Sequence, residues 1–265
     1  MCYTDKNDKG VDDIKTVVIT GASCGLGEEY LKQVISQMPD VEEIWLVARR
    51  LEKLEMLASR FAGHRIRCLP LDLTDTNSFE TYQRELEAEK PQIALLINNA
   101  GCGKLGLVAE ANCAEQAGMV DLNCRALTAV TVLSIPYMER GAGILNVSSI
   151  ASFAPTPRMT VYSATKAYVS AFSKSLGEEL RPRGITVLTV CPGPMATNFL
   201  EVADIVGRSR TFETLPYCHP AIVAEKSLAR LLRGKRWYTN RLLYKFYRVL
   251  CKLLPHSLVM KFSKT

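Results

Sequence analysis

Short apolar runs alternate with longer amphipathic stretches over the first 190 residues of this chain. The apolar, mostly β-branched runs lie at residues 15–20, 43–48, 66–71, 93–97, 143–148 and 184–190. Apolar residues at helical spacing fill the intervals between them, up to about residues 38, 61, 89, 139 and 180. Short apolar runs bounded by turn residues are typical of buried strands. The alternation predicts an α/β fold whose parallel sheet is covered on both faces by right-handed crossovers.

The remaining segments complete a single domain over residues 1–265, because no linker or internal repeat interrupts the pattern. Residues 1–13 are polar and charged, which predicts a flexible lead-in. Residues 194–217 have weak secondary-structure signals but many apolar side chains. Residues 240–265 show helical spacing, and we expect them to form a basic, amphipathic C-terminal helical extension.

The composition is that of an ordinary globular protein, with 48% hydrophobic and 23% charged residues. Nine scattered cysteines without a CxxC pair argue against a disulfide framework or a zinc site, and favour the reducing cytoplasm. Three histidines share no ligand spacing, so we expect no metal. No apolar run approaches the roughly 18 residues that span a bilayer, and the start has no signal-peptide core.

Positive charge is concentrated at the C-terminal end. Residues 226–265 contain eleven Lys/Arg and no Asp/Glu, whereas the whole chain carries +6. Seven apolar residues there share a helix face, with basic residues opposite. Such a helix either lies on an anionic membrane surface or packs on the protein with its charges in water. Binding of nucleic acid is not expected, because no helix-turn-helix pattern or interleaved aromatic residues accompany the charge.

Tyr162 and Lys166 stand four residues apart, on one face of a predicted helix. A phenol has an unperturbed pKa of about 10 and is a weak base at neutral pH. A neighbouring ammonium favours the phenolate, so we expect the pKa of Tyr162 to be lowered. The pair is thus a candidate for moving a proton to or from a substrate oxygen.

A glycine-rich turn follows the first predicted strand and opens a helix, an arrangement that suits phosphate binding. Its glycines, at 21, 25 and 27, match neither the usual dinucleotide pattern nor an NTPase loop. The second strand ends in Ala48-Arg49-Arg50, without the acid that holds the ribose of NAD. We therefore expect Arg49 to clamp a 2′-phosphate, which favours NADP(H).

With these features in place, residues 14–200 resemble the short-chain dehydrogenase/reductase family. The motifs that carry the resemblance occur in the family's order: TGASCGLG (20–27), LDL (71–73), NNAG (98–101), DLN (121–123), NVSS (146–149), YSATK (162–166) and PGPMAT (192–197). The resemblance implies a Rossmann-type, doubly wound sheet of about seven strands. It also implies an NAD(P)(H) oxidoreductase that interconverts an alcohol and a ketone, assembled as a homodimer or homotetramer.

The resemblance implies a role for each matching residue. Ser149, Tyr162, Lys166 and Asn123 would be catalytic, with Ser149 preferred to Ser148 because members place the serine thirteen residues before the tyrosine. Tyr162 and Lys166 would also bind cofactor, and the further cofactor residues implied are Gly21, Ser23, Cys24, Gly25, Leu26, Gly27, Arg49, Asp72, Leu73, Asn99, Ala100, Gly101, Pro192, Gly193 and Thr197.

Further details follow from the same family pattern. Asp72 would lie near the adenine, Asn98 beside the cofactor and Thr197 near the nicotinamide amide. Cys24 departs from NADP-using members, which often carry Arg, Lys or Ser there, and leaves Arg49 as the main support for NADP(H). In the implied mechanism Tyr162 exchanges the proton, Lys166 holds the ribose, and Asn123 completes a water path to solvent.

The resemblance also implies that residues 194–217 close over the substrate as a lid. The substrate is expected to be a bulky hydrophobic alcohol or ketone, because residues 153–157 and this lid are rich in apolar side chains. Arg208 and Arg210 in the lid could meet a distant anion, so a hydroxysteroid such as a bile acid fits both features. Two alternatives stay open: a reductase of acyl-carrier-bound or other lipid ketones, and a cofactor-bound sensor without turnover. Intact catalytic residues argue against the sensor.

Overall fold

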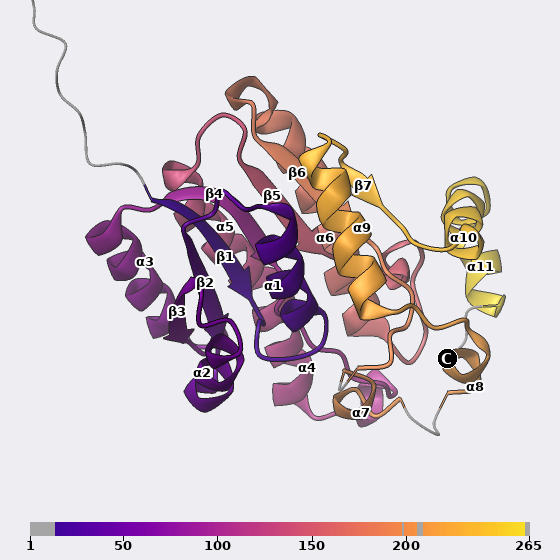
Figure 1. Cartoon of the computed structure of the whole chain (residues 1–265). Coiled ribbons are helices and arrows are strands. Elements are labelled where there is room, and N and C mark those ends of the chain that lie inside the picture. Colours follow the sequence, from indigo (N-terminus) through magenta and orange to yellow (C-terminus); the bar gives the residue numbers. More distant parts are fainter. Residues whose placement is uncertain (1–13, 198, 206–208, 263–265) are drawn as a thin grey trace, which may run out of the picture.

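Seven parallel strands form one sheet in the computed structural model, which describes residues 14–197, 199–205 and 209–262. The strand order is β3-β2-β1-β4-β5-β6-β7 (Figure 1). The strands are β1 (Lys15–Thr20), β2 (Glu43–Ala48), β3 (Arg65–Pro70), β4 (Gln92–Asn98), β5 (Gly143–Val147), β6 (Thr186–Val190) and β7 (Trp237–Tyr238). The expected single α/β domain with a doubly wound parallel sheet is confirmed.

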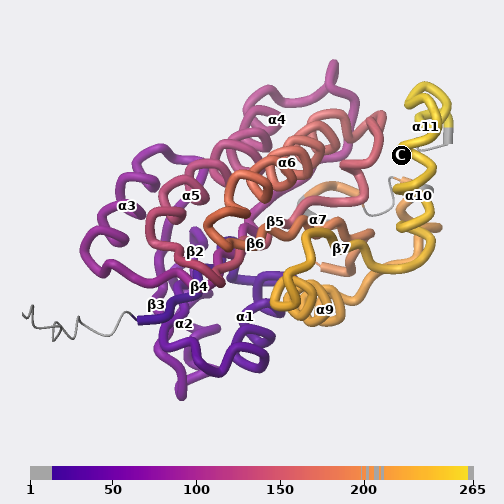
Figure 2. Tube along the Cα trace, turned by 90° about the horizontal axis from the view of Figure 1, so that it is seen from above, coloured from indigo at the N-terminus to yellow at the C-terminus, as the bar shows by residue number. Residues whose placement is uncertain are grey.

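Helices cover both faces of the sheet, as Figure 2 shows from above. The helices are α1 (Leu26–Gln37), α2 (Leu51–Ser59), α3 (Asn77–Glu89), α4 (Cys113–Val120), α5 (Leu127–Ser134), α6 (Thr160–Glu179), α7 (Phe199–Val202), α8 (Arg210–Thr214), α9 (Pro220–Leu232), α10 (Leu242–Leu253) and α11 (His256–Phe262). Helices α1, α2 and α9 share one core with the sheet, and α3, α5 and α6 share the other. Alternate residues of β1 enter the two cores: Val17 and Ile19 the first, Val18 the second.

The six strands expected from the apolar runs are found to within two residues. The seventh, β7, has only two residues in a basic stretch, too few to produce a periodic signal. The lead-in expected at residues 1–13 lies outside the described residues. The expected C-terminal extension is confirmed as α10 and α11, at the edge of the molecule beyond β7 (Figure 1).

The long helix expected over residues 113–139 is interrupted. A π-helical stretch, Asp121–Ala126, separates α4 from α5, and a 3₁₀ turn, Ile135–Tyr137, ends the segment. By length and composition, the stretch Cys113–Tyr137 is long and apolar enough to cross a membrane, although it contains no continuous apolar run of that length. Here it is a helix of the folded domain, with Met119, Val130 and Ser134 buried. Core helices pass the same test, so this is weak support for a membrane span.

Candidate active site

The carboxyl ends of the strands border one cavity of about 980 Å³. The sheet's connections change direction between β1 and β4, the position where ligands bind in open α/β sheets. The cavity starts at this switch point, passes β5 and β6, and ends at α10 and α11. It therefore offers room for a long cofactor and, beyond it, a second molecule.

The glycine turn between β1 and α1 forms the first wall. Gly21 and Gly25 have φ angles of +64° and +58°, a conformation that side-chain-bearing residues rarely adopt. Gly25 caps α1 without any side-chain hydrogen bond, so the helix N-terminus is open towards the cavity. A Cβ added to Gly25 would lie 3.4 Å from the Thr197 side chain across the turn. Thr197 therefore packs close to Gly25, and the free N–H groups at the open helix N-terminus suit an anionic diphosphate.

Gly27 has a different role from the one expected. It is absent from the cavity wall, and a Cβ on it would lie only 2.2 Å from the Gly21 carbonyl oxygen. Its lack of a side chain allows α1 to pack closely against the turn. Ser23, Cys24 and Leu26 line the cavity, and their cofactor contacts stay a prediction.

Positive charge gathers where β2 ends. Arg49, Arg50 and Lys53 line the cavity there, and Arg49 and Arg50 are exposed to solvent. Asp72 lines the opposite side and accepts hydrogen bonds from the Thr74 N–H (3.0 Å) and hydroxyl (2.7 Å). Burial opposes ionisation of Asp72, but the Thr74 hydrogen bonds and the Arg49 charge outweigh it and keep its pKa below the ordinary value. Leu73 completes this end.

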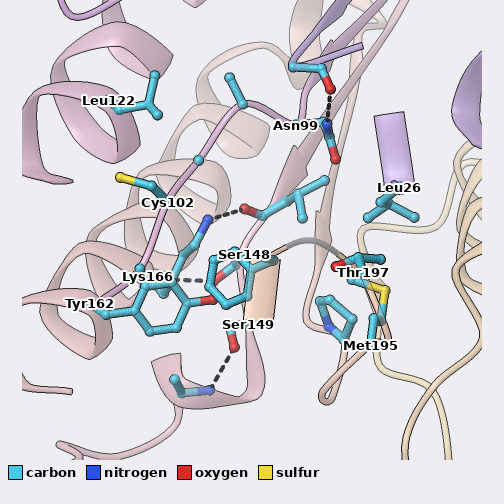
Figure 3. A pocket seen from close by; sticks show the side chains of 18 of the residues that line it. Leu26, Asn99, Cys102, Leu122, Ser148, Ser149, Tyr162, Lys166, Met195 and Thr197 are labelled. Carbon is cyan, nitrogen blue, oxygen red and sulfur yellow. Dashed lines mark hydrogen bonds between the residues drawn. The ribbon is translucent and has the colours of Figure 1, made fainter. Parts of the chain in front are cut away.

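The segment after β4 lines the middle of the cavity through Asn99, Ala100 and Gly101. The Asn99 amide donates to the carbonyl oxygens of Thr20 and Gly21, both at 3.1 Å, and so holds the glycine turn against β4 (Figure 3). Asn98 is absent from the wall, contrary to the expectation that it lies beside the cofactor. Its buried amide instead donates to Thr131 and Asn146, both at 2.8 Å, because successive residues of a strand point to opposite faces.

Ser149, Tyr162 and Lys166 meet on the wall formed by β5 and α6 (Figure 3). The Ser149 hydroxyl oxygen accepts the Ala151 N–H at 3.1 Å, which fixes the position of the hydroxyl beside Tyr162. The neighbouring Ser148 hydroxyl donates to the Lys166 carbonyl oxygen at 2.8 Å. Ser148 therefore holds α6 against β5, and Ser149 is the serine beside the tyrosine.

Burial dominates the ionisation of this pair. It raises the pKa of Tyr162 to about 12, with the Ser149 hydrogen bond acting in the opposite direction. It also lowers the pKa of Lys166 to about 8. The Lys166 ammonium donates to the Val147 carbonyl oxygen at 2.9 Å and lies 5.8 Å from the centre of the Tyr162 ring. The expectation that Lys166 lowers the tyrosine pKa is therefore wrong for the protein alone, because desolvation outweighs the distant ammonium.

Asn123 lies behind the wall rather than on it. Its amide holds the Cys102 backbone, accepting from N–H at 2.9 Å and donating to C=O at 2.8 Å, and also donates to Thr165 at 3.0 Å. A Cβ on Gly101 would lie 3.0 Å from Asn123 Oδ1 and 3.2 Å from Lys166 Nζ, so the two side chains approach one point. The π-helical stretch carries Asn123, and such bulges are frequent at functional sites.

The far end of the cavity is apolar. Its walls come from the segment after β6 and from the helices α4, α10 and α11, which the sequence patterns did not assign to the site. The main apolar residues of these walls are Met119, Met159, Phe199, Leu200, Phe212, Leu215, Leu243, Tyr247, Leu250, Leu254 and Val259. Phe199 packs on Tyr162 with ring centres 5.6 Å apart. Pro192, Gly193 and Thr197 line the cavity between this segment and the glycine turn, and their cofactor contacts stay a prediction. Of the segments that form these apolar walls, the sequence patterns assigned only residues 194–217 to the substrate.

Two expectations about this end need correction or stay open. Of residues 153–157, only Thr156 lines the cavity, whereas Phe153 packs against Trp237 and Tyr247. Arg208 lies outside the described residues, and Arg210 belongs to α8 without a described side chain. The suggested contact with a distant anion therefore remains a prediction.

The C-terminal helix α10 packs on the domain with a face different from the one expected. Tyr244 is 1% exposed, and its ring fills the space that a Cβ on Gly193 would occupy. Leu242 and Leu253, two of the apolar residues predicted to share one helix face, are 80% and 76% exposed, so this face does not pack on the domain. Aromatic residues and cysteine provide the packing face because the cavity and the Gly193 loop lie on that side.

Comparisons with known proteins agree with this geometry. The family model described as short chain dehydrogenase matches residues 15–204. Nodulation protein G of Rhizobium sp. (strain N33) is 34% identical over 181 residues, which cover 68% of this chain and 72% of that protein.

Solved structures are similar over nearly the whole chain. A short-chain dehydrogenase from Sphingobium yanoikuyae in complex with NADPH has a TM-score of 0.77 and 27% identity, covering 91% of this chain and 96% of that one. The bulky-bulky ketone specific alcohol dehydrogenase from Comamonas testosteroni has a TM-score of 0.70 and 28% identity, covering 92% and 96%. On its motifs, its fold and these matches, the chain belongs to the short-chain dehydrogenase family of oxidoreductases.

Proposed function

We propose that this oxidoreductase uses NADP(H) to interconvert a secondary alcohol and a ketone on a bulky hydrophobic molecule, with a hydroxysteroid or bile acid as the leading candidate. The observation that carries the proposal is the single cavity that joins a basic cofactor end to an apolar end at Tyr162 and Ser149. The cofactor would supply or accept the hydride. All other parts of the reaction are assigned to side chains of this chain.

The residues at the glycine turn and β2 would hold the cofactor. The open N-terminus of α1 and Thr197 would bind its diphosphate, and Arg49 its 2′-phosphate. Solved relatives contain NADPH or NAD, so the choice depends on this chain's own residues. The absence of an acid in Ala48-Arg49-Arg50 supports the phosphate-bearing form.

Proton transfer is assigned to Tyr162. In ketone reduction its buried phenol would donate a proton to the developing alkoxide, while the Ser149 hydroxyl hydrogen-bonds the same oxygen. In alcohol oxidation the phenolate would accept that proton. Lys166 would bind the cofactor ribose with its remaining N–H donors, and Asn123 would fix the Cys102 backbone beside it. The solvent path through Asn123 stays a prediction.

The substrate assignment rests on the apolar end. Its side chains come from α4, α7, α8, α10 and α11 and include four aromatic rings, which suits a rigid polycyclic alcohol. The specificity of the Comamonas alcohol dehydrogenase for bulky-bulky ketones supports a large substrate on both sides of the carbonyl. Acyl-carrier-bound ketones remain the second candidate, because the basic C-terminal region could meet an acidic carrier.

The test is a panel of ring and chain ketones and alcohols, each assayed with both cofactors. We expect turnover of at least one polycyclic substrate with NADP(H). Arg49→Ala should raise the KM for NADPH at least tenfold and leave the KM for NADH within twofold. Arg84→Ala, an exposed arginine on α3, is the matched control. Equal NADPH affinity in the Arg49 variant would remove the NADP(H) assignment.

We also propose a homo-oligomer in the cytoplasm. Val120, Val132 and Tyr168 leave 44%, 58% and 41% of their surfaces exposed on α4, α5 and α6, which suits a contact between copies. All eight described cysteines are free thiols, in keeping with a reducing compartment. Light scattering at working concentration would give the oligomer size, and a monomer would overturn the assembly proposal.

A further inference from the structure

Helix α10 is held to the domain by one side only. Arg248 lies over the Trp237 ring, 3.7 Å from its centre, and the Tyr244 hydroxyl donates to the Pro216 carbonyl oxygen at 2.7 Å. Tyr247 packs on Phe153 with ring centres 6.0 Å apart. These contacts fix how the helix is rotated relative to the cavity. Its opposite side faces away from the domain.

That opposite side is an apolar stripe in solvent. Leu242, Phe246, Val249 and Leu253 follow one another at helical spacing and are 80%, 66%, 52% and 76% exposed. We call these four residues the outer stripe. Large contiguous apolar surfaces on a folded protein mark interaction sites, whereas scattered single residues do not. The outer stripe spans the full length of a twelve-residue helix.

The outer stripe continues into the substrate cavity. With about 100° of rotation per residue, Leu243 and Leu250 lie next to the stripe on one side of α10. Both line the cavity, and Leu243 is also 49% exposed, so the cavity wall reaches the surface there. An apolar molecule could pass from the stripe to the cavity without crossing a charged side chain of α10.

Basic residues border the other side of the outer stripe. Lys245 and Lys252 are exposed on this border, and Arg241 stands just before the helix. No acidic residue occurs anywhere in residues 226–265. A symmetric contact between two copies through this face would bring equal charges together, which disfavours a second copy as the occupant. An anionic lipid surface complements both the apolar stripe and the basic border.

We propose that α10 docks on an anionic lipid surface through the outer stripe, with the cavity mouth beside the bilayer. Phe246 and its neighbours would lie in the headgroup–acyl boundary, and Lys245 and Lys252 among anionic headgroups. Only one consequence of docking rests on the proposed function, namely that lipid-dissolved alcohols and ketones would enter the cavity from the membrane. Docking itself requires no turnover.

Vesicle flotation of the full chain tests the proposal. The vesicles are pure phosphatidylcholine, or phosphatidylcholine with about one-third phosphatidylglycerol. We expect binding to the anionic vesicles only, weakened at least tenfold by Phe246→Glu and about fivefold by Lys245→Gln. Met56→Glu is the matched control: Met56 on α2 is 64% exposed, and its substitution adds the same negative charge away from the outer stripe. Melting temperature and NADPH binding verify that each variant is folded.

Three outcomes overturn the proposal. The first is failure of the parent chain to bind anionic vesicles, and the second is equal vesicle binding by the parent chain and the Phe246→Glu variant. The third is a parent chain that self-associates but binds no vesicles, together with a Phe246→Glu variant that no longer self-associates. The last would assign the outer stripe to a second copy. Vesicle binding by a chain that turns over no substrate would leave the docking intact and remove the proposed function, so the two fail separately.

Discussion

The pH dependence of alcohol oxidation tests the assignment of Tyr162 as the base. Burial raises the pKa of Tyr162 to about 12 in the protein alone, against about 10 for a free phenol. Two units correspond to about 3 kcal/mol against forming the phenolate. At pH 8, only about one phenol in ten thousand would then be ionised before cofactor and substrate bind.

Oxidation needs the phenolate, whereas reduction needs the phenol. We therefore expect kcat/KM for oxidation to rise about tenfold per unit from about pH 6 to pH 8, while that for reduction stays constant. Above about pH 8 the slope should fall, because Lys166, whose pKa is lowered to about 8, loses the charge with which it would hold the cofactor ribose.

The assay follows the absorbance of reduced nicotinamide at saturating cofactor, in both directions and across that pH range. Lys166→Gln should lower oxidation most below pH 8 and remove the change in slope. An oxidation rate independent of pH would refute the reasoning. So would an unchanged slope in the residual activity of Tyr162→Phe, since another group would then be the base.

Three further substitutions test individual contacts. Ser149→Ala should lower kcat/KM about 100-fold. Ser148→Ala should mainly lower the free energy of unfolding by about 1 kcal/mol, because its hydrogen bond to α6 is lost. Comparable losses of rate in the two variants would contradict the assignment of Ser149 as the serine that contacts substrate. Tyr244→Ala should reduce the free energy of unfolding by about 3 kcal/mol and Tm by about 6–12 °C, measured by thermal melting. In Gly103→Ala the new Cβ would lie 2.7 Å from the Phe199 ring, so kcat should fall more than tenfold with cofactor binding unchanged; normal turnover would show that the ring moves freely.

The sheet, and the meeting of Ser149, Tyr162 and Lys166 on one cavity wall, could be predicted from the sequence because local signals specify them. A buried parallel strand is a continuous apolar run, and the Tyr162–Lys166 spacing survives any small error in helix boundaries. Neighbouring residues in the sequence do not show whether Asn98 or Asn99 lines the cavity, because that depends on which side of β4 faces it. Gly27 was misassigned for a similar reason: its close neighbour, the Gly21 carbonyl, is set by tertiary packing.

The pKa of Tyr162 and the side of α10 that lines the apolar end of the cavity both depend on burial, which a sequence does not show. Two residues four apart on a helix suggest a strong charge interaction, yet Lys166 donates to Val147 and desolvation decides the pKa of Tyr162. Likewise, helical spacing identified α10 but not its rotation. The contacts of Tyr244 and Arg248 determine which side lines the cavity and which is exposed.

Hydride transfer itself is the most direct test of the central claim. NADPH deuterated at the transferring position is incubated with the best ketone of the panel, and the alcohol is analysed by mass spectrometry. We expect one deuterium per product molecule for the parent chain. We also expect turnover reduced at least 1000-fold in Tyr162→Phe, with NADPH binding within twofold. Product without deuterium, or a Tyr162→Phe variant as active as the parent chain, would contradict the account.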